Sequence, residues 1–324
     1  MSRALDSWWH DLGSPDPFVV VAGAGTGTLA ASVLAARPQC LTTLRYVLVE
    51  RSAALRRRQA ERLALEPAAQ VLGPRGSSGQ GPGPAAGDPD DDARPLPGQG
   101  PLATSLATLP AGPFTGVVLA NELLDNLPFR LLECGPGAGW SEVRVGEDLA
   151  EVLVPAPSDG RDAAHALAPD AAAGARIPLQ DEARRWLGSA LRCLSSGRVV
   201  VLDYADVTSS MARRPWTEWV RTYRGHARGG HPLAELGEQD VTCEVAVDQL
   251  ARVRNPVQDR SQAAFLRAFG VDRLAEEARQ AWHERAAVGD LEALKARSRV
   301  GEAAALTDDA GLGRFRVLEW EVAG

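Results

Sequence analysis

The residues whose types and spacing could do chemistry begin with three glycines, Gly23, Gly25 and Gly27. They follow a run of β-forming residues, 18–21, and precede an Ala/Leu-rich helical pattern that continues to residue 36. A strand, a glycine turn and a helix in this order open many nucleotide-binding α/β sheets. The glycines let the backbone approach a ligand closely, and the first N–H groups of the helix point toward it. We therefore expect a nucleotide-type cofactor over this turn.

The order of the glycines narrows the expected cofactor. It reads G-x-G-x-G, which is typical of S-adenosylmethionine (SAM) methyltransferases, whereas dinucleotide enzymes favour G-x-G-x-x-G. Residues 44–50 predict the next strand, which ends in Glu50, where a carboxylate would accept hydrogen bonds from both ribose hydroxyls. Two alternatives stay open: a tight turn can be glycine-rich without a ligand, and Glu50 can be the N-terminal charge of a helix over 53–65 that Ser52 caps.

A second group of polar residues follows the apolar run 116–120, which we interpret as a central parallel strand. Asn121, Glu122 and Asp125 stand directly after it. Glu122 and Asp125 are our candidate catalytic residues, because carboxylates can orient a guanidinium bidentately and a methylated nitrogen must lose a proton. The alternative for Asn121 and Asp125 is capping of a helix after the strand.

A third polar group, Asp203 and Tyr204 with Asp206, stands at the carboxyl end of the buried strand predicted over 198–204. Ligands of open α/β sheets bind outside the carboxyl ends of the strands. We therefore expect these three groups to converge on one crevice.

Composition excludes several classes of function. The chain has 324 residues, of which 45% are hydrophobic, and a net charge of −7, so it can bury a large core and offers no basic surface for nucleic acid. The densest basic run, residues 51–62, is interpreted as the solvated face of a helix. No apolar run reaches about 18 residues, so we expect no membrane insertion.

We expect no metal site and no disulfide framework. The cysteines form no C-x-x-C pair and stand beside no histidine at ligand spacing; they are Cys40, Cys134, Cys193 and Cys243. Free buried thiols and the absence of a signal-peptide core at the N-terminus favour a cytoplasmic protein.

The pattern of elements predicts an α/β fold, with a Rossmann-like, class I methyltransferase sheet that is mostly parallel and carries β-meander and helical insertions. We expect a single domain over 1–324. Its parts are a core (15–130, 177–206 and 314–323), a low-complexity loop (73–101), a β-meander and loop insertion (131–176), and a substrate-side and helical insertion (207–313).

Several elements are expected outside the central strands. Within these parts the periodicity predicts an amphipathic helix over 177–195, no periodic element over 211–237, and an Ala/Pro/Gly loop over 155–176. Helices are expected over 261–269 and 272–298, and a final strand over 315–322 that would suit the antiparallel edge of the sheet.

These motifs, taken together, resemble one known family, the MidA-like SAM-dependent methyltransferases, over most of the chain from about residue 15 onward. The resemblance rests on GAGTGTLA (23–30), YVLVERSAALRRRQ (46–59), VVLANELLDNLPF (117–129), VVVLDYAD (199–206), RTYRGH (221–226) and GEQDVTCEVAVDQL (237–250). SQAAFLRAFGV (261–271) and GLGRFRVLEWEV (311–322) resemble the C-terminal region of that family. Its mitochondrial members act in respiratory complex I assembly and are protein arginine methyltransferases.

The resemblance implies a role for each matching residue. The three glycines would cradle the methionine part of SAM, Glu50 would hold its ribose, and Asn121 and Glu122 would face the sulfonium and the acceptor. The family's second signature would line the substrate side; here it comprises Arg221, Tyr223, His226, Gln239 and Asp240.

Three functions remain open. The first is methyl transfer to a protein arginine, with a protein such as a respiratory-complex subunit as partner. The second is methyl transfer to a small-molecule nitrogen or oxygen. The third is a catalytically weak assembly factor that keeps the fold. Val21, which stands where the family usually has an acid, favours the third, whereas Glu50 and the Asn121–Glu122 pair favour the first two. The sequence does not specify an oligomeric state.

Overall fold

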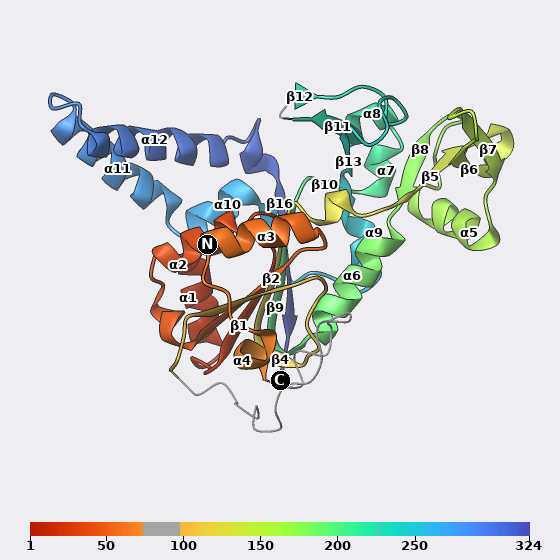
Figure 1. Cartoon of the computed structure of the whole chain (residues 1–324). Coiled ribbons are helices and arrows are strands. Elements are labelled where there is room, and N and C mark those ends of the chain that lie inside the picture. The colour runs from red at the N-terminus through yellow and green to blue at the C-terminus, as the bar shows by residue number, and fades with distance from the viewer. Residues whose placement is uncertain (74–97, 226) are drawn as a thin grey trace. The chain divides into compact units, whose positions relative to one another are not determined.

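The computed structural model describes residues 1–73, 98–225 and 227–324 (Figure 1). The chain divides into two compact units. The first comprises Met1–Ala120, Ala190–Leu202 and Val257–Gly324, and the second comprises Asn121–Ser189 and Asp203–Pro256. Most of the predicted low-complexity loop, residues 74–97, lies outside the described residues, as does His226.

The first unit is built on a seven-stranded sheet with the order β15-β16-β9-β4-β1-β2-β3. Strand β1 pairs in parallel with β2 and β4, β2 pairs in parallel with β3, and β15 pairs antiparallel with β16. This confirms the expected α/β class with a mostly parallel sheet. The strands are β1 (Phe18–Gly23), β2 (Leu44–Val49), β3 (Leu102–Leu106), β4 (Phe114–Asn121), β9 (Leu194–Asp203), β15 (Gln258–Ser261) and β16 (Arg316–Val322).

One face of this sheet is covered by a continuous core. Phe18, Val20 and Ala22 alternate along β1 onto this face, as the period of a strand requires, and pack with residues of three helices. The helices are α1 (Ser2–Asp11), α2 (Thr28–Ala35) and α10 (Gln262–Ala268). Trp8 of α1 lies against Phe265 and Phe269, with ring centroids 6.2 and 5.9 Å away. The first unit also contains η1 (Gln39–Thr43), α3 (Ala53–Arg62), α4 (Ala68–Leu72), α11 (Val271–Arg285), α12 (Leu291–Leu306) and η4 (Leu312–Arg314).

The second unit contains the predicted β-meander, which forms a four-stranded sheet of order β7-β6-β5-β8. Helix α5 (Ser158–Leu167) covers one face of this sheet and packs on Leu132, Trp140 and Ile177 of its strands. The strands are β5 (Arg130–Cys134), β6 (Trp140–Val145), β7 (Glu151–Pro155) and β8 (Arg176–Leu179). A smaller sheet has the order β12-β11-β13, from β11 (Val220–Arg224), β12 (Ala227–Arg228) and β13 (Asp240–Cys243).

Short elements complete the second unit. They are η2 (Leu124–Asn126), η3 (Pro136–Ala138), β10 (Ala205–Asp206), α7 (Thr208–Met211), α8 (Trp216–Trp219), β14 (Val245–Ala246) and α9 (Val247–Ala251). Helix α6 (Asp181–Arg192) begins in the second unit and ends in the first.

Four local predictions were wrong, each because a long-range contact decided the structure. Residues 176–179 form β8, which pairs with β5, so the helix expected from 177 starts only at Asp181 and ends at Arg192. The predicted loop over 155–176 contains α5, which buries Ala164 and Leu167. The segment 211–237 contains α8, β11 and β12. Strand β16 lies inside the sheet, because β15 pairs with it and forms the edge.

The helix expected over 272–298 is instead two helices, α11 and α12. The break lies at residues 286–290, where Gly289 has a left-handed backbone (φ +64°) and the Asp290 side chain caps α12 by accepting a hydrogen bond from the Ala293 N–H. Figure 1 shows the two helices as a hairpin.

Candidate active site

The glycine turn of the first unit has the predicted strand–turn–helix form. Gly23 ends β1, and Gly25 and Gly27 have left-handed backbones, with φ of +47° and +79°. A side chain at Gly27 would be strained by that backbone, and its Cβ would lie 3.2 Å from Leu48 Cδ2. Within the described residues no acceptor takes the N–H groups of Gly25 and Thr26. Within that part of the chain the turn therefore presents two unpaired donors, which suits an anionic group on a ligand.

Glu50 lies just beyond the end of β2, next to the start of α3. Its Oε1 accepts a hydrogen bond from the Ser52 N–H at 2.8 Å, and Ser52 Oγ caps α3 by accepting one from the Leu55 N–H at 3.3 Å. Among the described residues its Oε2 has no hydrogen-bond partner. The carboxylate is thus anchored through one oxygen, while the other can accept a hydrogen bond from a ribose hydroxyl.

Val21 is part of the sheet core. It is fully buried, and its neighbours in register are Val47 and Val118. The position that often carries an acid in the resembling family is therefore an apolar packing position here, and a carboxylate there would be costly to bury.

The acidic cluster of the second unit, Glu122, Asp125 and Asp203, is held by hydrogen bonds to the backbone. Asp203 Oδ2 accepts from the N–H groups of Leu124 and Asp125 at 3.0 and 3.3 Å, and its Oδ1 accepts from the Tyr204 N–H at 3.0 Å. Asp203 is only 1% exposed and Asp125 only 4%. The carboxylate of Asp203 therefore fixes the backbone of Leu124, Asp125 and Tyr204. The carboxylate of Asp125 accepts a hydrogen bond from Asn126 Nδ2 at 2.7 Å.

The cluster has an unusual electrostatic environment. Burial, together with the charge of Glu122, raises the pKa of Asp125 to about 6. Burial and the charge of Asp125 also raise the pKa of Asp203 well above its usual value. The surrounding protein desolvates Glu122 and raises its pKa, although its side chain reaches the surface. Among the described residues, none of the three carboxylates forms an ion pair. Within the described part of the chain these acids therefore lie close together without a counter-ion.

Glu122 also has a strained backbone. Its φ of +47° lies in the left-handed region, which costs an L-residue about 1 kcal/mol or more. Such strain is common at functional sites, where the surrounding structure holds a side chain in a required orientation.

The structure brings further predicted residues to this cluster. The pKa of Tyr204 is raised to about 12, chiefly by burial. Glu122 and Tyr223 lie near enough to contribute to this rise. The Arg221 guanidinium lies over the Tyr204 ring, 5.4 Å from its centroid, and Nη2 donates to Glu244 Oε1 at 2.9 Å. Arg221 is therefore not a free counter-ion for the acids.

Strand register places part of the second signature on one face of the β12-β11-β13 sheet. Tyr223 pairs with Asp240 and Arg221 pairs with Thr242, so Arg221, Tyr223 and Asp240 share a face. Gln239 has a different role in the structure, since its Nε2 donates to the carbonyl oxygens of His231 and Ala234 at 2.8 and 2.7 Å and closes a loop.

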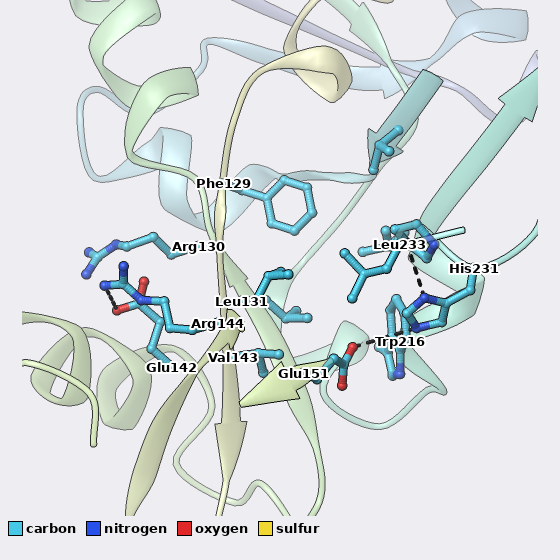
Figure 2. A pocket seen from close by; sticks show the side chains of 14 residues that line it. Phe129, Arg130, Leu131, Glu142, Val143, Arg144, Glu151, Trp216, His231 and Leu233 are labelled. Atoms are coloured by element: carbon cyan, nitrogen blue, oxygen red, sulfur yellow. Dashed lines mark hydrogen bonds and ion pairs between the residues drawn. The ribbon is translucent and has the colours of Figure 1, made fainter. Parts of the chain in front are cut away.

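A pocket of about 330 Å³ lies on the other face of this small sheet (Figure 2). Val220 and Val241 line it from β11 and β13, which places it opposite Arg221 and Tyr223. Leu131 and Val143 form a wall from the meander, and Trp216, His231 and Leu233 lie across from them.

Sequence reasoning missed two buried residues that organise these regions. Gln59 is fully buried beneath the glycine turn. Gln59 lies four residues from both Leu55 and Leu63, a spacing that places it on the apolar face of α3. The arginines between these positions made that pattern hard to recognise in the sequence. Glu244, which is 6% exposed, accepts from both Arg221 and Arg214, at 2.9 and 2.7 Å, and no sequence pattern indicated it.

The fold and the glycine turn define a class, α/β enzymes that bind a nucleotide-type cofactor at the end of the first strand. A family model described as "Putative S-adenosyl-L-methionine-dependent methyltransferase" matches residues 1–263. The chain belongs to this family, is a SAM-dependent methyltransferase and uses SAM as its cofactor. Among the described residues no helix is long and apolar enough to cross a membrane.

Solved structures are similar over the whole chain. A Burkholderia thailandensis protein crystallised with S-adenosyl-homocysteine has 25% identity and a TM-score of 0.71, over 100% of this chain and 76% of that one. A native crystal structure from the same organism has 25% identity and a TM-score of 0.70, over 100% of this chain and 78% of that one. No curated protein matches the chain.

Proposed function

We propose that the chain transfers a methyl group from SAM to an arginine of a protein. The observation that carries this proposal is the acidic cluster, which has no counter-ion among the described residues. A guanidinium supplies the missing positive charge and can donate two parallel hydrogen bonds to a carboxylate. The family resemblance of the sequence agrees with this acceptor and makes a respiratory-complex subunit the first polypeptide to test.

We propose that the glycine turn and Glu50 hold the cofactor. The free N–H groups of Gly25 and Thr26 would bind its carboxylate, and Glu50 Oε2 would accept from its ribose. Asn121 ends β4 and would lie on the sulfonium side. When bound, SAM supplies an electrophilic methyl group on a positively charged sulfur.

Within the proposed reaction, Glu122 and Asp125 hold the acceptor and its proton. Glu122, exposed and strained, would orient the guanidinium and accept the proton that the nitrogen loses when the new N–C bond forms. Asp125, whose pKa of about 6 keeps it mostly ionised at pH 7, would supply the second negative charge. Asp203 fixes the turn that carries Asp125, and Tyr204, Arg221, Tyr223 and Asp240 would shape the acceptor side.

A small-molecule amine is the second candidate acceptor, because the same acids, which have no counter-ion among the described residues, would bind any organic cation. One experiment separates the two. Host lysate is incubated with the enzyme and methyl-labelled SAM, and the polypeptide and low-mass fractions are analysed by mass spectrometry after acid hydrolysis. Labelled methylarginine in the polypeptide fraction supports the proposal. Label confined to the low-mass fraction supports the small amine and contradicts the protein acceptor.

A further inference from the structure

The side chain of Gln59 connects three elements beneath the glycine turn. It projects from α3, its Nε2 donates to the carbonyl oxygen of Gly25 at 2.7 Å, and its Oε1 accepts from Ser105 Oγ on β3 at 2.6 Å. The side chain is fully buried, and its Cγ lies 3.4 Å from the position that a Cβ on Gly27 would occupy. A buried amide with both ends satisfied is fixed in orientation as well as in place.

This hydrogen bond fixes a peptide plane. The bond between Gly25 and Thr26 is not among the cis peptides of the described residues, so the Gly25 carbonyl and the Thr26 N–H point in opposite directions. Because Gln59 holds the carbonyl inward, the Thr26 N–H is aimed outward, away from α3. That N–H has no acceptor within the described part of the chain.

A glycine turn would otherwise hold this plane weakly. Gly25 has a left-handed backbone, and a glycine can rotate its φ and ψ at low cost, so the plane could flip and present a carbonyl oxygen to the ligand. A carbonyl in that position would repel the carboxylate of a bound amino-acid group, whereas an N–H attracts it.

We propose that Gln59 is a positioning residue for the cofactor, which keeps the peptide between Gly25 and Thr26 oriented so that the Thr26 N–H receives the carboxylate of SAM. The inference rests on the proposed placement of SAM at the glycine turn. Gln59 does not touch the cofactor itself, and Ser105 acts one step further back by holding the amide in the orientation that donates to Gly25.

The first test replaces the amide with an apolar group of similar size, Gln59→Leu. We expect SAM to bind roughly tenfold more weakly in calorimetry, because the loss of an oriented hydrogen bond to a charged group has about that effect. An affinity within twofold of the wild type would overturn the proposal. Ser105→Ala leaves Gln59 in place and should weaken binding roughly threefold. An unchanged affinity in this milder variant would also count against the proposal, even where Gln59→Leu does not fold.

The second test uses pH to distinguish positioning from a general structural role. In Gln59→Glu an ionised carboxylate cannot donate to the Gly25 carbonyl, but a protonated carboxyl can. Burial raises the pKa of a carboxyl, so the variant should recover SAM affinity, relative to the wild type at the same pH, as pH is lowered from about 9 to 6. A ratio of affinities that stays flat with pH would contradict the proposal.

Two control variants separate the possible failures. Gln249 of the second unit is also buried, at 2% exposure, and donates to Pro178 and Thr208, so Gln249→Leu should lower the melting temperature without changing SAM affinity. Glu50→Ala tests the cofactor site itself. If Glu50→Ala weakens SAM binding and Gln59→Leu does not, only the role of Gln59 fails. If neither variant weakens binding, the placement of SAM at this turn fails as well.

Discussion

The glycine turn of the first unit and the acidic cluster of the second differ in how their polar groups are stabilised. The turn accepts a neutral hydrogen bond, from the buried amide of Gln59 to the Gly25 carbonyl, and that amide accepts one in turn from Ser105. The cluster holds carboxylates whose pKa values are raised by burial and by one another. One of its residues, Glu122, has a left-handed backbone conformation. The comparison teaches that this chain is ordered where we place the cofactor and electrostatically strained where we place the acceptor.

We expect the largest loss of activity from a substitution in the acidic cluster. Glu122→Gln keeps the size of the side chain but removes its charge and its ability to accept a proton. We expect kcat to fall about 100-fold or more, with SAM affinity nearly unchanged, because general base catalysis contributes about that much. Calorimetry and initial rates measure the two quantities. Normal turnover would remove Glu122 from the proposed chemistry.

Asp125 should show stability and activity changing in opposite directions with pH. Its pKa of about 6 is above the usual value for an unfolded chain, so the folded protein binds the extra proton. The free energy of unfolding should therefore rise as pH falls from 7 through 6 toward 4, while kcat/KM falls as the carboxylate is neutralised.

Asp125→Asn mimics the neutral state. It should stabilise the protein at pH 7 by on the order of 1–3 kcal/mol, flatten this part of the stability profile, and reduce turnover roughly tenfold. Thermal unfolding at several pH values and initial rates provide the measurements. A variant that is less stable than the wild type at pH 7 would argue against an uncompensated buried charge.

On the cofactor side, Glu50→Ala should weaken SAM binding about tenfold and leave kcat nearly unchanged at saturating SAM, since one charged hydrogen-bond acceptor is lost. Ser52→Ala is the matched control, because it removes the cap of α3 but keeps the carboxylate. It should lower stability by about 1 kcal/mol without a comparable loss of affinity. Equal losses in both variants would mean that Glu50 matters only for the helix start.

The smallest effect is expected for Gly25→Ala. The left-handed φ of +47° costs a residue with a Cβ about 1 kcal/mol, but among the described residues, its chain neighbours apart, no atom lies within 4 Å of that Cβ. Gly27→Ala adds a contact 3.2 Å from Leu48 to a similar backbone cost, so it should be the more destabilising of the two. Thermal melts of both variants test this order, and a reversed order would show that space is not what selects glycine at position 27.

The sequence predicted those parts of the fold that local patterns determine. The strands around Val20, Val47 and Val118 are continuous apolar runs, and the glycine turn follows from residue type alone. The prediction failed where pairing overrode local preference. The amphipathic pattern predicted a helix at Ile177, but residues 176–179 pair as a strand with Arg130–Glu133, and Ile177 is fully buried.

The candidate site shows the same division. Glu50, Glu122 and Asp125 could be chosen as candidates from the sequence, because they follow strands and ligands of open α/β sheets bind outside the carboxyl ends of the strands. Gln59 was not predicted, because its importance comes from a hydrogen bond to Gly25, which lies 34 residues earlier in the chain. Glu244 likewise owes its role to two arginines that the fold brings to it from other segments.

The α11–α12 hairpin has a consequence for how the protein opens. Its helices bury little: only Ala278 is buried in α11, and only Ala293 and Ala296 in α12, while Leu274, Leu291 and Leu294 are largely exposed. Regions with so few buried apolar groups open at a much lower free energy than a central sheet. The amides of this hairpin should therefore exchange with deuterated solvent long before those of β1, and a protease should cut near its bend before it cuts within the central sheet.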